Sequence, residues 1–202
     1  MKVLTNAALT LGLTMFLFGP AHAALRVFAC EPEWAAVARE IGGDKVETSS
    51  ATSPDQDVHY LQARPSLIAQ VRRADLVFCT GADLEVGWLP VLLRQAGNAK
   101  VQPGQPGYFE AASAVSMLEV PTSVDRSQGD VHPFGNPHIQ TDPRNIAKVA
   151  AAVAERLAKL DVADAAFKEV KDAGWMVLPA SNAGELKRTL DIVIGEKILL
   201  EK

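Results

Sequence analysis

Apolar residues fall into short runs and helically spaced sets along the first half of the chain. The runs predict strands at residues 25–29, 45–49 and 75–79. Apolar positions within residues 31–41 follow the i, i+3, i+4, i+7 spacing of one helical face, which predicts a helix that ends at Gly42 and Gly43. A second helix is predicted from Pro65, since proline is favoured at the first helical position.

The second half of the chain continues this alternation. A helix is predicted over residues 85–95, followed by a Pro/Gly-rich connection at 102–107 and a short apolar segment at 114–118. The clearest amphipathic helix comes next, with Asp142 placed as its N-cap and Pro143 as its first residue. Its apolar face comprises Ile146, Val149, Ala150, Val153 and Leu157.

Strands that alternate with helices predict an α/β fold, a parallel sheet flanked by helices on both faces. We assign residues 24–160 to this lobe. Residues 161–202 form either a helical extension or a tail unrelated to the lobe. Within that region, helices are compatible with residues 162–171 and 185–200, and a strand with residues 175–178.

The first 23 residues have the layout of a secretory signal peptide. Lys2 supplies a positive charge, residues 7–18 form an apolar stretch, and residues 21–23 give the small-x-small pattern of a cleavage site. The apolar stretch is shorter than the ~20 residues of a membrane span, although an uncleaved anchor is the alternative. We therefore expect cleavage after Ala23 and a soluble, monomeric, periplasmic protein.

The charge balance excludes several classes of partner. The chain has 20 basic and 24 acidic residues, a net charge of −4 at pH 7. Removal of the leader takes away Lys2 and no acid, which leaves 19 against 24, or −5. Because no basic patch occurs, nucleic acid and anionic membrane surfaces are not expected partners.

Three histidines outside the leader are the main candidates for chemistry. His59, His132 and His138 each fall in a polar or Gly/Pro-rich segment, and such loops gather beyond the carboxyl ends of parallel strands. Neutral imidazole is a common ligand of Zn²⁺, and Mn²⁺ accepts it alongside carboxylates. Taken singly, each could instead be a solvated loop residue. Two prolines and a glycine stiffen the segment between His132 and His138, which lowers the entropy lost on binding a cation.

Cys30 and Cys79 both end predicted strands of the same sheet. In an oxidising compartment an even pair of cysteines suggests a disulfide. Two buried free thiols explain them equally well, because cysteine packs as a small hydrophobe. The sequence leaves both alternatives open.

The sequence contains no nucleophile elbow, phosphate-binding loop, dinucleotide-binding glycine motif or HExxH zinc motif. Asp83 and Glu85 are acids of the kind that helix starts commonly carry. We therefore expect a binding protein and not an enzyme. The rival hypothesis is a metal-dependent hydrolase that uses the three histidines and an open position for water.

Three segments resemble the metal-binding substrate-binding proteins (cluster A-I) of zinc and manganese ABC transporters. Residues 57–59 (DVH) and 63–66 (ARPS) are similar to the family's D-x-H…P-S segment. Residues 74–85 (ADLVFCTGADLE) are similar to its strand and turn. Residues 136–143 (NPHIQTDP) are similar to the loop that opens its long helix. Together the motifs cover roughly residues 25–160.

The resemblance implies a protein that binds Zn²⁺, or alternatively Mn²⁺, between two α/β lobes and delivers it to an inner-membrane ABC permease. The two histidine ligands of the family's N-terminal lobe match His59 and His138. His132 lies where some zinc-binding members carry an extra histidine. Gln140 replaces the family's usual aromatic residue or histidine.

The chain departs from the family beyond this lobe. The family's second lobe supplies a third histidine and a carboxylate, and no histidine follows His138 in this sequence. We interpret the chain as the N-terminal lobe of the family, truncated or with a substituted tail. A transport-incompetent relic or a metal chaperone is the alternative function. Water or a carboxylate such as Asp57 or Asp130 is expected to complete the coordination of the metal.

Overall fold

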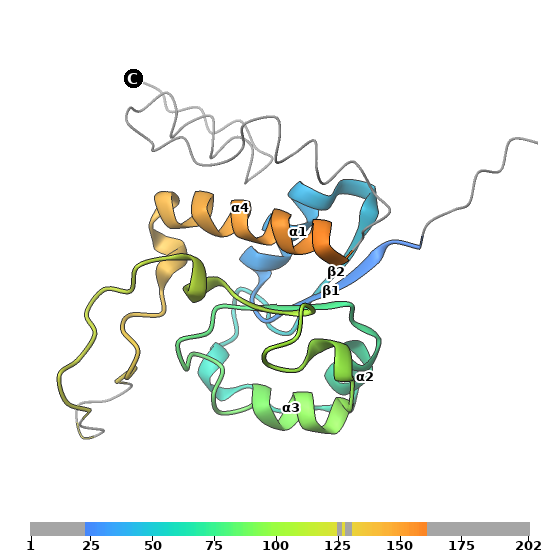
Figure 1. Ribbon diagram of the computed structural model, residues 1–202. Coiled ribbons are helices and arrows are strands. Elements are labelled where there is room, and N and C mark those ends of the chain that lie inside the picture. Colours follow the sequence, from blue (N-terminus) through green and yellow to red (C-terminus); the bar gives the residue numbers. More distant parts are fainter. Residues whose placement is uncertain (1–22, 125–126, 128–130, 161–202) are drawn as a thin grey trace, which may run out of the picture.

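The computed structural model describes residues 23–124, 127 and 131–160 (Figure 1). At its centre lies a four-stranded sheet in the order β2-β1-β3-β4, and every pairing in it is parallel. Ala29, at the end of β1, lies opposite Ser50 on one side and Phe78 on the other. The strands are β1 (Leu25–Ala29), β2 (Val46–Ser50), β3 (Leu76–Cys79) and β4 (Tyr108–Glu110).

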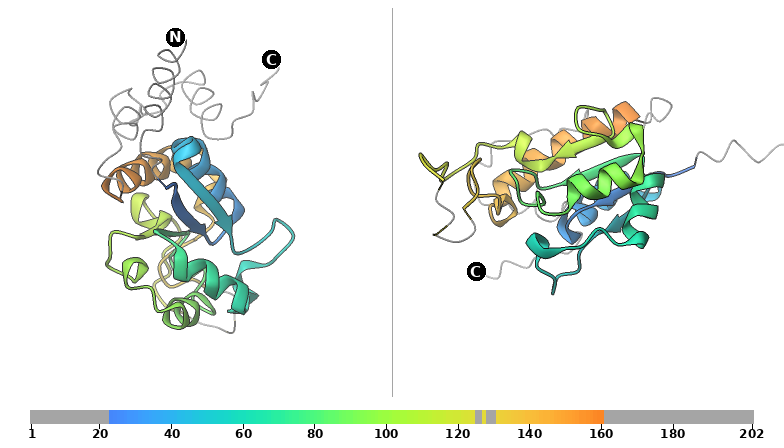
Figure 2. Two further views of the ribbon diagram at one scale, coloured as in Figure 1. Left: turned by 90° about the vertical axis from the view of Figure 1, so that its right-hand side faces the viewer. Right: turned by 90° about the horizontal axis from the view of Figure 1, so that it is seen from below.

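Helices cover both faces of this sheet (Figures 1 and 2). On one face lie α1 (Pro32–Gly42) and α4 (Pro143–Leu160), and on the other lie α2 (Pro65–Arg73) and α3 (Leu89–Ala96).

Each pair of helices closes a separate apolar core. Successive residues of a strand point to opposite faces, so Val27 of β1 packs with the α1 and α4 side chains while the adjacent Phe28 packs with those of α2 and α3. In β3, Phe78 likewise packs with the α1 and α4 side chains and Val77 with those of α2 and α3. The predicted parallel α/β fold is confirmed.

The helix predicted at residues 85–95 begins later than expected, at Leu89. Residues 81–83 all have positive φ, of 80°, 55° and 67°, and this left-handed turn cannot continue into a helix. The side chain of Glu85 bonds back to the turn, and Pro90 then occupies the first turn of the late-starting helix. The assignment of Glu85 to a helix start is therefore wrong.

The strand β4 was absent from our predictions. Only Phe109 of its three residues is buried, so it lacks the apolar run that marks β3. It also follows the Pro/Gly-rich connection directly, and a Cβ on Gly107 would meet the Lys100 and Asp75 carbonyl oxygens at 2.5 and 2.6 Å. Glycine is required for this close approach. Residues 114–118, noted for their apolar character, form no strand.

Short 3-10 turns complete the described structure, and no helix within the described residues is both long and apolar enough to cross a membrane. The predicted leader, apart from Ala23, and the 161–202 tail lie outside the described residues. The turns are Gly43–Lys45, Val58–Tyr60, Ala99–Val101, Ala111–Ala114 and Ile139–Thr141.

Candidate metal centre

The loop after β2 presents His59 on a 3-10 turn that Asp57 caps. The Asp57 carboxylate accepts a hydrogen bond from the His59 backbone N–H at 2.9 Å and lies 2.8 Å from the ring Nδ1. These bonds hold the pKa of Asp57 below its usual range. With Nδ1 engaged in this way, the opposite nitrogen, Nε2, is the one left to bind a metal, an arrangement common among histidine ligands.

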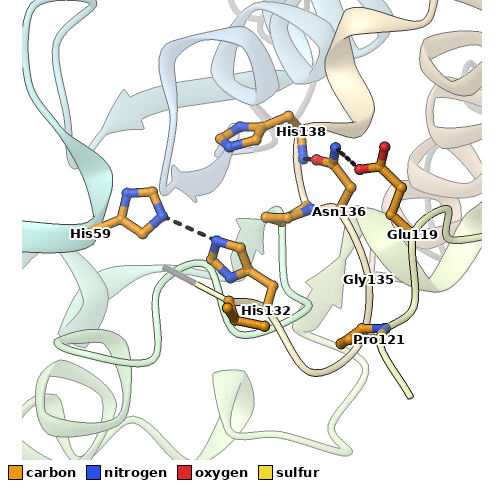
Figure 3. Close-up of a pocket in the computed structure, with 9 residues that line it drawn as sticks. His59, Glu119, Pro121, His132, Gly135, Asn136 and His138 are labelled. Carbon is orange, nitrogen blue, oxygen red and sulfur yellow. Dashed lines mark hydrogen bonds between the residues drawn. The ribbon is translucent and has the colours of Figure 1, made fainter. Parts of the chain in front are cut away.

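His132 meets His59 across the cavity shown in Figure 3. The two Nε2 atoms are 3.3 Å apart, and the ring centroids are 5.3 Å apart. Two imidazoles that share a tetrahedral zinc at Zn–N distances of 2.0–2.1 Å have their nitrogens about 3.3–3.4 Å apart. The pair is therefore spaced as two ligands of one ion would be.

His138 lies further from the other two histidines. Its ring centroid is 6.4 Å from both of theirs, whereas rings that share one zinc are about 5 Å apart. Its backbone N–H donates to Asn136 Oδ1 at 3.0 Å, and Asn136 Nδ2 donates to Glu119 at 2.8 Å (Figure 3). All three histidines line the same cavity, and His138 needs an inward shift of roughly 1 Å to complete a shared site.

The cavity has a volume of about 350 Å³ and also exposes the carboxylate of Glu119. Sequence reasoning did not identify Glu119, which belongs to no motif and has a left-handed backbone with φ of 54°. The structure brings it to the histidines through Asn136. Glu119 is thus a carboxylate of the cavity that could hold a water ligand of the metal.

Asp57 and Asp130 were expected to complete the coordination, and Asp142 was expected to cap a helix. Asp57 is hydrogen-bonded to His59, and Asp130 lies outside the described residues. Asp142 accepts the backbone N–H of Arg144 at 2.9 Å and pairs with its guanidinium at 2.8 Å. The bond from the Arg144 backbone N–H is the N-cap role expected for Asp142.

A second group of polar residues is buried, which the sequence did not predict: Glu85 was interpreted only as an acid at a helix start, and Glu31 was not considered. Glu31 and Glu85 are only 5% and 2% exposed. Glu85 accepts the backbone N–H groups of Thr80 at 2.8 Å and Gly81 at 3.1 Å, while the Thr80 hydroxyl donates to Glu31 at 3.0 Å. Burial raises the pKa of Glu85 to about 7, and burial together with the charge of Glu85 raises that of Glu31. The nearby charge of Glu85 therefore favours the protonated form of Glu31.

A disulfide joins Cys30 and Cys79 beside these acids, with a Cα–Cα distance of 4.7 Å. Of the two alternatives that the sequence left open, the structure has the bridge. Both cysteines are completely buried.

The chain is similar in sequence to proteins named as substrate-binding lipoproteins of metal ABC transporters. It is 27% identical over 174 residues to the metal ABC transporter substrate-binding lipoprotein FimA of Streptococcus parasanguinis, covering 76% of this chain and 55% of FimA. It is 28% identical over 156 residues to the manganese ABC transporter substrate-binding lipoprotein PsaA of Streptococcus pneumoniae, covering 68% of this chain and 49% of PsaA. The chain spans about half the length of these relatives.

Solved structures share the fold. A crystal structure of a zinc-bound ZnuA deletion mutant superposes with a TM-score of 0.62 at 24% identity, covering 82% of this chain and 55% of that one. A second ZnuA crystal structure gives the same TM-score at 23% identity. Residues 27–172 match the family described as "ZnuA: Zinc-uptake complex component A periplasmic". The chain therefore belongs to the ZnuA family.

Proposed function

We propose that this chain is a non-enzymatic, periplasmic metal-binding protein that captures Zn²⁺ for an ABC-type importer. The observation that carries the proposal is the 3.3 Å separation of the His59 and His132 Nε2 atoms in a cavity that His138 also lines. Family membership supports the transport role and the inner-membrane permease as partner. The predicted leader supports cleavage and release into the periplasm.

The composition of the ligand set favours zinc over manganese. Imidazole nitrogen suits Zn²⁺, whereas Mn²⁺ prefers carboxylate, carbonyl and water oxygens. Here three nitrogens face one cavity. Asp57 already bonds His59, and Glu119 accepts from Asn136. Relatives named for manganese make Mn²⁺ the competing cargo.

Metal binding would act chiefly on His138. The other two histidines already have the separation of shared ligands, so the ion would draw His138 inward on its short loop. Three nitrogens leave one position of a tetrahedral zinc site open. Water held by Glu119 would fill that position, and the ion would stay partly solvated and able to leave.

Calorimetric titration of Zn²⁺ into the wild type, His59→Ala and His138→Ala at two pH values tests the proposal. Each substitution should weaken binding by roughly 100-fold, since a complete four-ligand zinc site is worth about 10–16 kcal/mol. Affinity should fall as the pH drops through about 6.5, where histidine normally takes up a proton and can no longer bind metal. Unchanged binding in both variants would refute the site.

The same titration with Mn²⁺ ranks the two metals, and a higher affinity for Mn²⁺ would overturn the zinc assignment. Metal-loaded protein should show no turnover on phosphoester and peptide panels. Hydrolysis that disappears in His59→Ala would favour the enzyme hypothesis instead. Zinc binding without delivery to the permease would favour the relic or chaperone hypothesis.

A further inference from the structure

The disulfide lies where the winding direction of the sheet reverses. From β1 the chain moves to β2 on one side and then crosses to β3 on the other. Cys30 directly follows β1 and Cys79 ends β3, so both sulfurs sit at the carboxyl ends of the two central strands. In open α/β sheets this reversal point is where ligands bind.

Two buried acids lie at this end of the sheet without a basic partner. Glu85 has a carboxyl oxygen close to both sulfurs, and Glu31 follows Cys30 in the chain. In the described part of the chain, no hydrogen bond or salt bridge to a lysine, arginine or histidine reaches the carboxyl groups of Glu31 or Glu85. Oε1 of Glu31 has no hydrogen-bond donor at all among these residues. A buried oxygen of this kind normally has a partner. The region is therefore rich in acceptors and poor in positive charge.

The sulfur atoms and the Glu85 carboxylate are also close to one another. One ligand atom from each of Cys30, Cys79 and Glu85 lies within 4.8 Å of the other two, and all three residues are buried. Two thiolates bound to one tetrahedral zinc at Zn–S distances of 2.3 Å are about 3.8 Å apart. The fold thus gathers two sulfurs and an oxygen within the span of a single ion.

We propose that reduction of the disulfide converts this cluster into a second metal site, with Cys30, Cys79 and Glu85 as ligands, beside the unpartnered Oε1 of Glu31. In the oxidised protein the sulfurs are bonded to each other and offer no thiolate. A dithiol reductant supplies two electrons and two protons and closes to its own cyclic disulfide. The two cysteine thiols then release their protons as the ion binds.

The ligand set defines the class of metal. Soft thiolates select ions such as Zn²⁺, and a buried carboxylate completes sets of this kind. The ion would supply the positive charge that the two acids lack. Disulfide and metal exclude each other, so this site exists only in the reduced protein, whereas the histidine site does not depend on the redox state.

The acid cluster has a route to solvent. Glu31 lines a cleft of about 480 Å³ that His59 and His138 also line. An ion could therefore reach Glu31 from the histidine side of the molecule. A variant without the histidines separates the two sites experimentally.

The test uses the full chain carrying His59→Ala, His132→Ala and His138→Ala, with Co²⁺ as the probe. The protein is reduced with dithiothreitol, freed of reductant without air, and titrated with Co²⁺. A near-ultraviolet band from thiolate-to-cobalt charge transfer should grow and saturate at one equivalent. The oxidised protein and the Cys30→Ala/Cys79→Ala variant should give no band. Glu85→Gln should weaken Co²⁺ binding by about tenfold or more, and Glu40→Gln, an exposed acid outside the cluster, should not.

Three outcomes would overturn the proposal. The first is a reduced chain that keeps its far-ultraviolet circular dichroism and shows no charge-transfer band. The second is equal Co²⁺ binding by the reduced chain in denaturing urea, because free thiols and not the fold would then bind the ion. Loss of the fold on reduction would equally remove the site. None of these results bears on the histidine site, which the variant lacks.

Discussion

The histidine cavity and the disulfide cluster occupy the same edge of the sheet, yet they differ in what holds them. His59, His132 and His138 come from loops, and His138 is exposed. Cys30, Cys79 and Glu85 come from strand ends and one tight turn, and all are buried. A ligand that must enter and leave needs the first arrangement, because loop side chains can move without disturbing the core.

The two regions also differ in what they contribute: the first to the proposed metal binding, the second to the stability of the fold. The histidines line a cavity outside both apolar cores and contribute little to the fold, as suits the proposed metal site. The buried cluster instead stabilises the fold, because its disulfide and its hydrogen-bonded acids hold β1, β3 and the 81–88 turn together. A link joins the two regions, because Trp88 Nε1 donates to the Val58 carbonyl at 2.8 Å next to His59.

The largest expected effect is on stability and comes from the disulfide. Replacing both cysteines, as Cys30→Ala/Cys79→Ala, should lower the free energy of unfolding by about 4 kcal/mol, from the loop entropy of a bridge that spans 49 residues. Urea denaturation measures this change. The zinc affinity of the folded variant should stay within about threefold of wild type. A large loss of zinc affinity would show that the two regions are not separable.

The second effect is on the pH dependence of stability. The pKa of Glu85 is raised from its ordinary 4.5 to about 7 in the folded protein, so the folded state binds a proton that the unfolded chain has released. The stabilisation that protonation of Glu85 contributes is therefore fully present below about pH 4.5. It is lost as the pH rises to about 7, which lowers the free energy of unfolding by on the order of 3 kcal/mol. Thermal denaturation should show a flatter pH profile for Glu85→Gln and an unchanged pH profile for the exposed control Glu40→Gln.

The third effect is on metal affinity alone. Asp57→Asn removes the carboxylate that orients the His59 ring, and zinc affinity should fall by about 10- to 100-fold. Asp57 is exposed, so the free energy of unfolding should change by less than about 0.5 kcal/mol. Calorimetry measures the zinc affinity, and urea denaturation of the same samples measures the free energy of unfolding. Destabilisation without loss of affinity would reverse the assignment of Asp57.

The smallest effect concerns Asp142, four residues after His138. Asp142→Ala should destabilise the protein by about 1 kcal/mol through loss of the α4 cap, and Asp142→Asn, which can still cap, by much less. Neither should alter zinc affinity by more than about threefold. Loss of zinc binding in Asp142→Asn would instead identify Asp142 as a metal ligand.

The local sequence pattern determined those parts of the protein in which the type of a residue indicates whether it is buried or exposed. Val149, Val153 and Leu157 are helically spaced apolar residues, and all three are buried in the predicted α4. His59 and His138 were identified from loops and short motifs. The turn at residues 81–83 could not be predicted, because no local sequence feature indicates a left-handed backbone at Ala82 and Asp83.

Only the tertiary structure decided which distant residues meet. The sequence by itself determined a parallel α/β lobe and three histidines as candidate metal ligands, since periodicity and motifs are properties of neighbouring residues. It could not bring His132 within 3.3 Å of His59, 73 residues away. It could not pair Glu31 with Glu85 either, because an acid next to a helix is usually a solvated one. Both contacts arise from the parallel register of the sheet, which carries separate strand ends to one edge.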